Sequence, residues 1–380
     1  MVGQGWLIVQ ELGGKASDLG VLGAATAVPA ILINLFGGVL ADRLDRKKIL
    51  IATTSATTIL MAALAALDLS GSVQIWHVQL IAALNGVSFG FDWPTRNAFF
   101  PQLIKRDHMA SAVTLNTIVW QGSRVVIPAV AGVMIRYSGT GSVFLASAAG
   151  YAVMLLVLFT LSSPPVPPRP KRHVLKDMAE GIRFITRAPL FRVIIPLTFA
   201  NMFFGLQYLQ LMPLFAQRFG ASEQQFGSMF SAVGAGAVLG VVAASRVQNS
   251  RFTGRAMLAG TFVFTLFLVA FAFAPTYGAT LPLLFCAAFF NAVFLITSMT
   301  ALQLQVPDSL RGRVMGIHSI TFSLIPLGGL LGGGVATLTD ERWAIAGSAL
   351  ALALVLVFVA VTQRHIRELD GSRLRVSLPA

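Results

Sequence analysis

The sequence predicts an all-α integral membrane protein, and three observations support this prediction. Hydrophobic residues make up 56% of the chain and charged residues 11%, whereas soluble globular proteins carry roughly 25% charged residues. Apolar runs of about 18 residues or more recur from end to end, and each is long enough to cross ~30 Å of hydrocarbon. Most Lys and Arg residues fall in the short segments between these runs.

The apolar runs predict eleven complete membrane spans. They lie near residues 19–41, 49–67, 75–99, 111–135, 142–162, 191–216, 225–245, 256–274, 279–303, 314–337 and 343–362. Residues 1–12 would extend only ~18 Å as a helix, which is less than the hydrocarbon thickness. We therefore expect the first span of this chain to be partial.

The positive charges predict an orientation. Successive spans alternate in direction, so the connecting segments form two sets. One set holds 22 of the 28 Lys and Arg residues, and the other holds only Lys15, Arg136, Arg218 and Arg342. Because moving cations across the membrane is costly, the rich side should be cytoplasmic. We expect a multi-pass protein of the cell (inner or plasma) membrane with a cytoplasmic C-terminus. The net charge of +13 then reflects topology and does not indicate a nucleic-acid partner.

A polar segment divides the chain into two similar halves. We expect an N-terminal transmembrane half at 1–162, a cytoplasmic linker at 163–188, a C-terminal half at 189–363 and a basic tail at 364–380. Apolar residues at helical spacing within 174–185 predict an interfacial helix in the linker, with a regulatory site as the alternative. A shift of 201 residues places Gly132 on Gly333 and Asp107 on Asp308. Parallel halves are a recurrent transporter design in which substrate binds between them.

A motif at the cytoplasmic end of the second span identifies a family. Gly38, Asp42, Arg43 and Arg46 lie in the run Gly38–Lys48, which resembles the signature loop of the major facilitator superfamily. Asp45 replaces the second Gly of that pattern. Gly38 permits close helix approach and Asp42 can accept from a facing helix N-terminus. The alternative is that this loop carries topogenic charge alone.

Further stretches are similar to one branch of the superfamily. Phe91–Ile104, Arg124–Gly132, Glu180–Phe184 and Val306–Met315 resemble the enterobactin-exporter-like branch, also called transmembrane secretion effectors. The resemblance implies a bundle of two pseudo-symmetric six-helix halves, with the first helix partial here, and ion-driven export of small molecules. Pro128 and Gly132 resemble the antiporter motif of the fifth span imperfectly, and a plain helix kink is the alternative.

Polar residues inside the spans are the candidate site residues. Asp92 and Arg96 are spaced i, i+4 in the fourth span and can pair. The resemblance implies a gate latch between Asp92 and Arg46, and the alternatives are a helix-end ion pair or a proton-binding acid. Cavity candidates in the fifth span share one face: Thr117, Gln121 and Arg124. An Arg within a span needs a partner, either a substrate or a buried acid.

The second half supplies weaker cavity candidates, namely Asn201, Tyr208 and Asn291. Helix–helix hydrogen bonding is their alternative role. The predicted function is a secondary active exporter of siderophore-, drug- or metabolite-like molecules that works by alternating access, with H+ antiport. A non-transporting or receptor-like relative, or an inactive fragment, is the alternative. We expect no enzymatic activity, no catalytic residue, no metal and no cofactor, because metal-ligand clusters and nucleotide-binding motifs are not found in the sequence. We also expect a monomer in the lipid bilayer.

Overall fold

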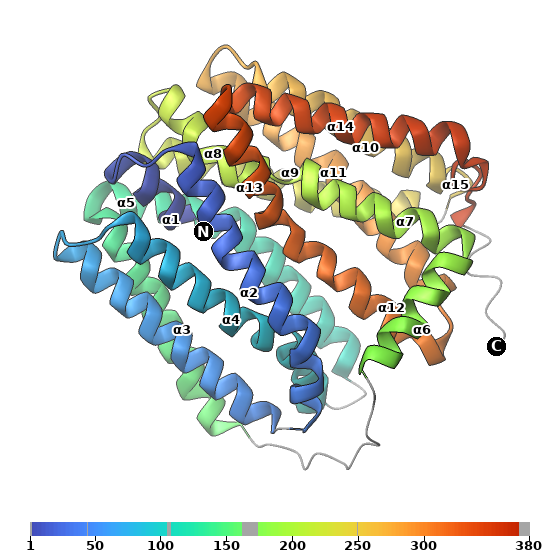
Figure 1. Cartoon of the computed structure of the whole chain (residues 1–380), viewed down its shortest axis with the longest axis horizontal. Coiled ribbons are helices and arrows are strands. Elements are labelled where there is room, and N and C mark those ends of the chain that lie inside the picture. The colour runs from blue at the N-terminus through green and yellow to red at the C-terminus, as the bar shows by residue number, and fades with distance from the viewer. Residues whose placement is uncertain (1, 44, 105–107, 162–173, 249, 372–380) are drawn as a thin grey trace.

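A computed structural model describes residues 2–43, 45–104, 108–161, 174–248 and 250–371. The described residues form helices and no strand (Figure 1). The first group of helices comprises α1 Val2–Trp6, the π-helix η1 Leu7–Glu11, α2 Ala16–Arg43, α3 Arg46–Leu69, α4 Ile75–Phe99, the 3-10 helix η2 Phe100–Leu103 and α5 Met109–Thr160.

The second group follows residue 173. It comprises α6 Val174–Arg187, α7 Pro189–Ala200, the π-helix η4 Asn201–Gly205, α8 Tyr208–Arg218, α9 Glu223–Val247, α10 Thr253–Ala272, α11 Tyr277–Gln305, α12 Asp308–Ile320, the 3-10 helix η5 Thr321–Ser323, α13 Leu324–Leu338, α14 Glu341–Thr362 and α15 Arg364–Arg367. The two groups lie side by side, with helices running obliquely between two ends of the molecule (Figure 1).

Each predicted span coincides with helix, but not always with one regular helix. Among the described residues, 8 helices are long and apolar enough to cross a membrane. Helix α4 is not one of them, because His77, Gln79, Asn85 and Asp92 interrupt its apolar residues. The predicted spans 111–135 and 142–162 run together as α5, and Gly139, with φ of 71°, makes the turn between them. Only glycine adopts such a backbone readily.

Two predicted spans are interrupted. The span predicted at 191–216 is α7, η4 and α8, and the span predicted at 314–337 falls in α12, η5 and α13. Pro196 and Pro213 lie inside α7 and α8, where each removes a backbone donor. Neighbouring helices can accommodate such breaks within a membrane.

The apolar core is concentrated in the second group. Phe215, Phe264 and Phe294 are fully buried in the largest cluster. A smaller cluster in the first group joins η1 to α2, α3 and α4 through Leu7, Leu19 and other apolar residues. Many large apolar side chains remain exposed on the outer surface, particularly along α5 and α14, as expected of helices that face lipid.

The amphipathic helix predicted in the linker is present as α6, and it packs on a neighbour. Arg313 of α12 donates to the carboxylate of Glu180 in an ion pair. Gly181 is buried, and a Cβ placed there would come within 2.8 Å of the Ile317 side chain. Helix α6 therefore lies against α12, as Figure 1 shows. Its predicted position on the membrane surface stays a prediction. Linker residues 163–173 and tail residues 372–380 lie outside the described residues.

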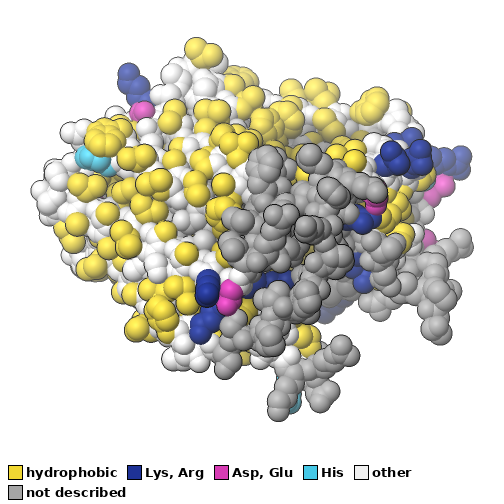
Figure 2. Space-filling model, turned by 60° about the horizontal axis from the view of Figure 1, so that its bottom comes forward, with side chains coloured by type: hydrophobic (Ala, Val, Ile, Leu, Met, Phe, Trp, Pro, Cys, Tyr) yellow, Lys and Arg dark blue, Asp and Glu magenta, His cyan; other side chains and the backbone are white. Residues whose placement is uncertain are grey.

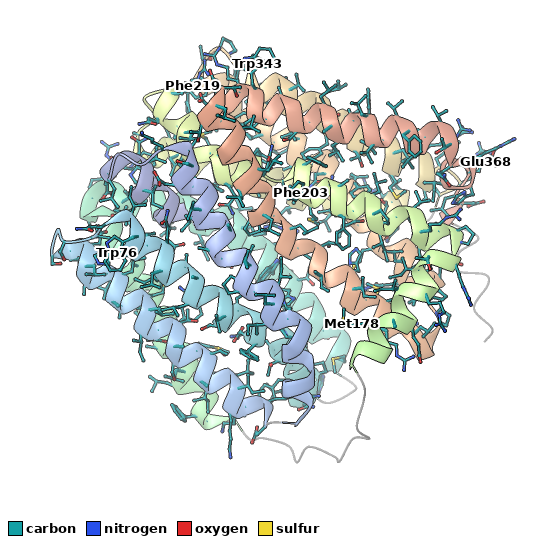
Figure 3. The ribbon with its side chains drawn as sticks, in the orientation of Figure 1. Trp76, Met178, Phe203, Phe219, Trp343 and Glu368 are labelled. Carbon is teal, nitrogen blue, oxygen red and sulfur yellow. The ribbon has the colours of Figure 1, made fainter. Side chains whose placement is uncertain are left out.

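Aromatic and charged side chains mark the two ends. Trp76 and Trp343 are 54% and 60% exposed near the first turns of α4 and α14, and they lie at one end, opposite Glu368 and Met178 (Figure 3). Exposed Trp at one level of a helical bundle is typical of a membrane interface. Figure 2 shows hydrophobic side chains spread over one face and Lys and Arg gathered on the side where α15 lies.

Candidate functional site

The two groups of helices meet along a first contact between α2 and α13. A Cβ placed on Gly23 would come within 2.5 Å of the Pro326 carbonyl oxygen. A Cβ on Gly333 would lie 2.5 Å from the Ala16 carbonyl and 3.0 Å from the Gly20 Cα. Glycine permits these backbones to touch, because any side chain would occupy the space between them. We call this contact the α2–α13 seam.

A second contact joins α5 to α9 in the same manner. A Cβ placed on Gly132 would lie 2.5 Å from the Glu223 carbonyl, and one on Gly227 would lie 2.5 Å from the Pro128 carbonyl. Ser231 donates a hydrogen bond of 2.7 Å to the Val125 carbonyl across this contact. We call it the α5–α9 seam. Pro128 and Gly132, predicted as an antiporter-like motif, both belong to it.

The two seams are related by the internal repeat. The shift of 201 residues predicted from the sequence places Gly132 on Gly333, and each of these residues packs against a glycine of the other group. Their partners, Gly227 and Gly20, are also equivalent in position, since each follows a positive-φ glycine, Gly220 or Gly13, by seven residues. The sequence analysis missed Gly20 and Gly227, although this second alignment could have found them.

Further contacts close the same end of the molecule. Trp6 packs against Phe226 with ring centroids 4.8 Å apart. Arg136 donates to the Gln224 side chain at 2.8 Å. Phe226 and Gln224 lie in the first turn of α9, beside the seam residues Glu223 and Gly227. The two groups are therefore joined at this end by both apolar and polar contacts.

The span of α5 that contains Gly132 is exposed near its other end. Residues 115–120 are all exposed, and Leu115, Ile118 and Trp120 are 63%, 62% and 55% exposed. Consecutive exposed residues cover the whole circumference of a helix. Trp120 nevertheless packs against Trp93 of α4, with ring centroids 5.5 Å apart, so this end of α5 contacts its own group and not α9.

Arg124 lies at the limit of the seam. Its carbonyl oxygen would meet a Cβ on Gly234 at 2.4 Å, whereas its side chain is exposed. The guanidinium makes no hydrogen bond or ion pair with a residue that the structure describes. The predicted cavity residue Tyr208 belongs to the other group of helices; it is 1% exposed, and its ring centroid lies 6.3 Å from that of Phe271.

The remaining cavity candidates differ in burial. Thr117 is exposed and Gln121 half-buried on the arm that carries Arg124. Asn201 is fully buried at the start of the π-helix η4, and neither its amide nitrogen nor its oxygen has a hydrogen-bond partner among the described residues. The Asn291 oxygen on α11 lacks one too. An unpaired buried amide costs about 1–3 kcal/mol, so both residues are suited to a ligand or to a second packing arrangement.

Asp92 sits in a defined network on α4. Arg96 donates to both of its carboxylate oxygens at 2.9 Å, and the Thr53 hydroxyl of α3 donates at 3.1 Å. Arg46 is buried and donates to the Ala98 carbonyl at 3.1 Å. The helix-end pair of Asp92 and Arg96 is therefore present, and the sequence analysis missed Thr53. The latch between Asp92 and Arg46 stays a prediction.

Three residues of the signature loop are described in their backbone alone. The backbone of α2 is helical through Gly38, Asp42 and Arg43, but the surroundings and side chains of these three residues lie outside the described part of the structure. Asp45 accepts from the Lys47 backbone at 2.8 Å and caps α3. This residue, which replaces a glycine of the family pattern, therefore begins a helix.

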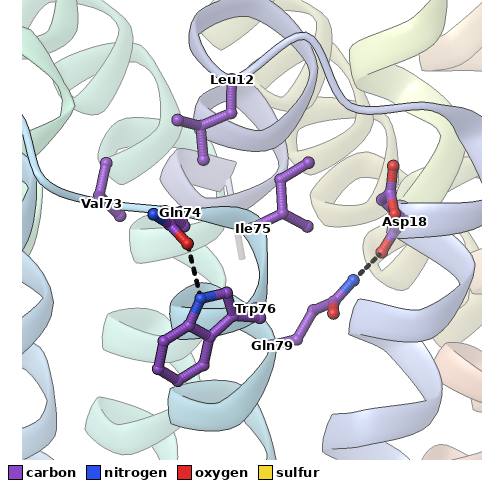
Figure 4. A pocket seen from close by; sticks show the side chains of 7 residues that line it. All are labelled: Leu12, Asp18, Val73, Gln74, Ile75, Trp76 and Gln79. Atoms are coloured by element: carbon purple, nitrogen blue, oxygen red, sulfur yellow. Dashed lines mark hydrogen bonds between the residues drawn. The ribbon is translucent and has the colours of Figure 1, made fainter.

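A peripheral pocket opens at the end that carries Trp76. It has a volume of about 500 Å³ and is lined by Leu12, Asp18, Val73, Gln74, Ile75, Trp76 and Gln79 (Figure 4). The Trp76 ring nitrogen donates to the Gln74 side chain and the Gln79 amide to the Asp18 carbonyl. Its polar side chains therefore already have partners, and it contains none of the predicted cavity residues.

The helical bundle and its paired contacts define the class. Two groups of apolar helices, joined through glycine seams with polar residues at their limit, are the architecture of polytopic membrane transporters. The family described as "Transmembrane secretion effector" matches residues 1–378. The chain belongs to this family, within the major facilitator superfamily, as predicted.

Curated and solved proteins agree with this assignment. The enterobactin exporter EntS of Escherichia coli K12 is 27% identical over 345 residues, which cover 89% of this chain and 82% of the exporter. Among solved structures, the nucleoside transporter NupG superposes with a TM-score of 0.72 at 16% identity, over 94% of this chain and 93% of that one. An inward-facing bacterial homologue of the human lysosomal transporter Spinster has a TM-score of 0.73 at 15% identity, covering 100% and 96%. The predicted fold class is confirmed.

Proposed function

We propose that this protein exports small anionic molecules across the cell membrane by alternating access. One observation carries the proposal: the two groups of helices touch along two repeat-related glycine seams at one end, and the exposed Arg124 lies where the α5–α9 seam stops. Alternating access requires such contacts to form and separate while the binding site stays between the halves. With the C-terminus in the cytoplasm, as the charges predict, the closed end is extracellular and the site opens inward.

The substrate class follows from Arg124. It is exposed, no described residue forms a hydrogen bond or an ion pair with it, and an Arg in a membrane span is stabilised only with a counter-ion. A planar guanidinium recognises carboxylate and phenolate oxygens by paired hydrogen bonds. Because the similar exporter of Escherichia coli is named for enterobactin, siderophores are the first compounds to test. We also propose H+ as the coupling ion and a monomer as the transporting unit.

Counterflow tests transport. Purified protein in proteoliposomes preloaded with unlabelled substrate should accumulate labelled substrate, and Arg124→Gln should abolish this exchange while the protein remains folded. Arg183→Gln removes an exposed charge from α6 and should exchange normally. A receptor or an inactive protein would bind label without exchange. Equal exchange by Arg124→Gln and Arg183→Gln would contradict the assigned substrate site.

Proton coupling needs a separate measurement. An imposed pH gradient should drive net uptake into inverted vesicles, and a proton ionophore should abolish net uptake but leave counterflow intact. Net uptake that follows a sodium gradient at constant pH would replace H+ with Na+ as the coupling ion.

A further inference from the structure

The segment after the last span folds back onto the bundle. Gly254, in the first turn of α10, donates its backbone N–H to the Leu369 carbonyl at 3.1 Å, and Gly371 donates to the Ser250 carbonyl at 3.0 Å. Ile366 of α15 is fully buried. A Cβ on Gly254 would clash with the Ile366 carbonyl. These contacts hold α15 and the residues after it against the connection between α9 and α10.

A pocket of about 450 Å³ lies between these two segments. It is lined by Arg251, Phe252, Arg255, Arg367, Glu368 and Asp370. We call it the arginine pocket. Its arginines come from parts of the chain more than 100 residues apart, so the fold itself brings them together. It is distinct from the seams and from the cavity candidates.

The charges of the arginine pocket are unbalanced. Arg251, Arg255 and Arg367 make no hydrogen bond or ion pair with any residue in the described part of the chain. Arg364, outside the pocket, donates to the Glu368 carboxylate at 2.7 Å, and this hydrogen bond holds the pKa of Glu368 below its usual value. Glu368 is therefore ionised and already engaged. Asp370 also lines the pocket, so its three guanidinium groups face two carboxylates, one of which Arg364 already shares. The pocket therefore keeps an excess of positive charge, which a bound anion would neutralise.

The arginine pocket lies at the ends of two membrane spans, at the depth of the membrane interface. It adjoins the first residues of α10, a candidate membrane span, and lies just past the end of α14, whose Val361 is 69% exposed. Phe252 is 46% exposed, and the Arg251 guanidinium lies over its ring at 4.7 Å. Figure 2 shows Lys and Arg side chains gathered on this side beside hydrophobic ones. An anion that fits this place has a charged head and an apolar tail.

We propose that the arginine pocket binds the phosphate headgroup of an anionic phospholipid, whose acyl chains lie along the exposed apolar surface of α10 and α14. Guanidinium groups bind phosphate oxygens through paired, charge-assisted hydrogen bonds. Basic residues beside membrane spans attract anionic headgroups in the same way. A bound lipid would fix the C-terminal segment to the membrane. A soluble phosphate would gain nothing from Phe252 or from the apolar helices.

Native mass spectrometry of the purified full chain tests this site. Phosphatidylglycerol should remain bound after detergent activation, whereas phosphatidylcholine should not. The variant Arg251→Gln/Arg255→Gln/Arg367→Gln should bind phosphatidylglycerol about 100-fold more weakly, since each interfacial Arg contributes roughly fivefold. The matched variant Arg183→Gln/Arg187→Gln/Arg192→Gln removes three exposed arginines of α6 and α7 and should bind as the wild type does.

Further measurements distinguish lipid recognition from a soluble-anion site and from nonspecific attraction. Glycerol 3-phosphate at millimolar concentration should compete poorly with the lipid, and equal competition would show a soluble-anion site and overturn the proposal. Equal loss of lipid in the two triple variants would show nonspecific attraction and would also overturn it. If the Gln variant is unstable, Arg251→Lys/Arg255→Lys/Arg367→Lys keeps the charge. It should bind phosphatidylglycerol several-fold more weakly than the wild type, and unchanged binding would refute recognition by guanidinium groups.

Discussion

A methyl group at Gly132 should force the α5–α9 seam apart. Its Cβ would lie 2.5 Å from the Glu223 carbonyl oxygen and 3.2 Å from the Cα atoms of Gln224 and Gly227. Ordinary contact begins at 3.4 Å, and every one of these atoms is backbone, so no rotamer change can relieve the clash. The two helices must separate by about 1 Å.

The expected magnitude comes from overpacking. Inserting a methyl group into a tight contact costs about 1–3 kcal/mol, and this cost falls only on the state in which the seam is closed. A difference of 1–3 kcal/mol between two states shifts their ratio about 5–150-fold. Gly132→Ala should therefore favour the access state in which the seam is open. The expression and thermal stability of the protein should change less than transport does.

Spin-label distances report this shift. With Cys286 replaced by Ala, labels at Ser72 and Thr276 lie on exposed turns of opposite groups at the seam end. Double electron–electron resonance should show a longer, broader distance in Gly132→Ala than in the parent protein. Gly122→Ala is the matched control, since it adds a methyl group to the same helix where nothing lies within 4 Å.

A substitution on α9 tests the same seam from its other side. Gly227→Ala approaches the contact from α9, where its Cβ would meet the Pro128 carbonyl at 2.5 Å. It should lengthen the distance as Gly132→Ala does, and the double variant should be less than additive because one separation relieves both clashes. Identical distance distributions for Gly132→Ala and Gly122→Ala would refute the proposal that the α5–α9 seam separates during alternating access.

Three further predictions concern orientation, the linker helix and the cavity. A single cysteine at Ser250 should react with an impermeant maleimide only after the membrane is opened, whereas one at Thr276 should react in intact cells; the reverse pattern would invert the proposed orientation. Glu180→Arg should raise hydrogen exchange in α6 about fivefold or less, because surface ion pairs contribute about 0.2–1 kcal/mol. The exchanged pair Glu180→Arg/Arg313→Glu should restore protection, and failure to do so would show that apolar packing alone holds α6. Arg124→Lys keeps the charge but loses the planar fork, so counterflow should fall clearly below the wild-type rate, and an unchanged rate would exclude paired hydrogen bonding to substrate.

Composition and pattern predicted a large part of this fold. Lipid demands long apolar helices with satisfied backbone groups, so the spans could be identified without tertiary information. The same argument could not show that one span contains the π-helix at Asn201 or that another breaks at Thr321. Irregular backbone within a membrane depends on neighbours that accommodate it, and those neighbours are distant in the sequence.

The candidate site was predicted in its residue types more than in its contacts. The sequence predicted both Arg124 and Tyr208 as cavity residues, because polar side chains inside apolar spans are energetically costly and often mark functional sites. Nothing in their local sequence indicated that Arg124 would be exposed beside a seam or that Tyr208 would be fully buried in the other group. Likewise, the i, i+4 spacing predicted the pair of Asp92 with Arg96, whereas Thr53 on α3 became a partner only when the helices packed.

The sequence by itself determined that the chain is a helical membrane protein of two related halves, because hydropathy and the repeat are properties of local and periodic residue order. Only the tertiary structure decided which glycines meet. Gly132 and Gly227 are 95 positions apart, and each looks like any other small residue of an apolar helix. Their role exists only because the two backbones approach so closely that a Cβ atom on either glycine would clash with the other helix. The packing of whole helices sets that distance.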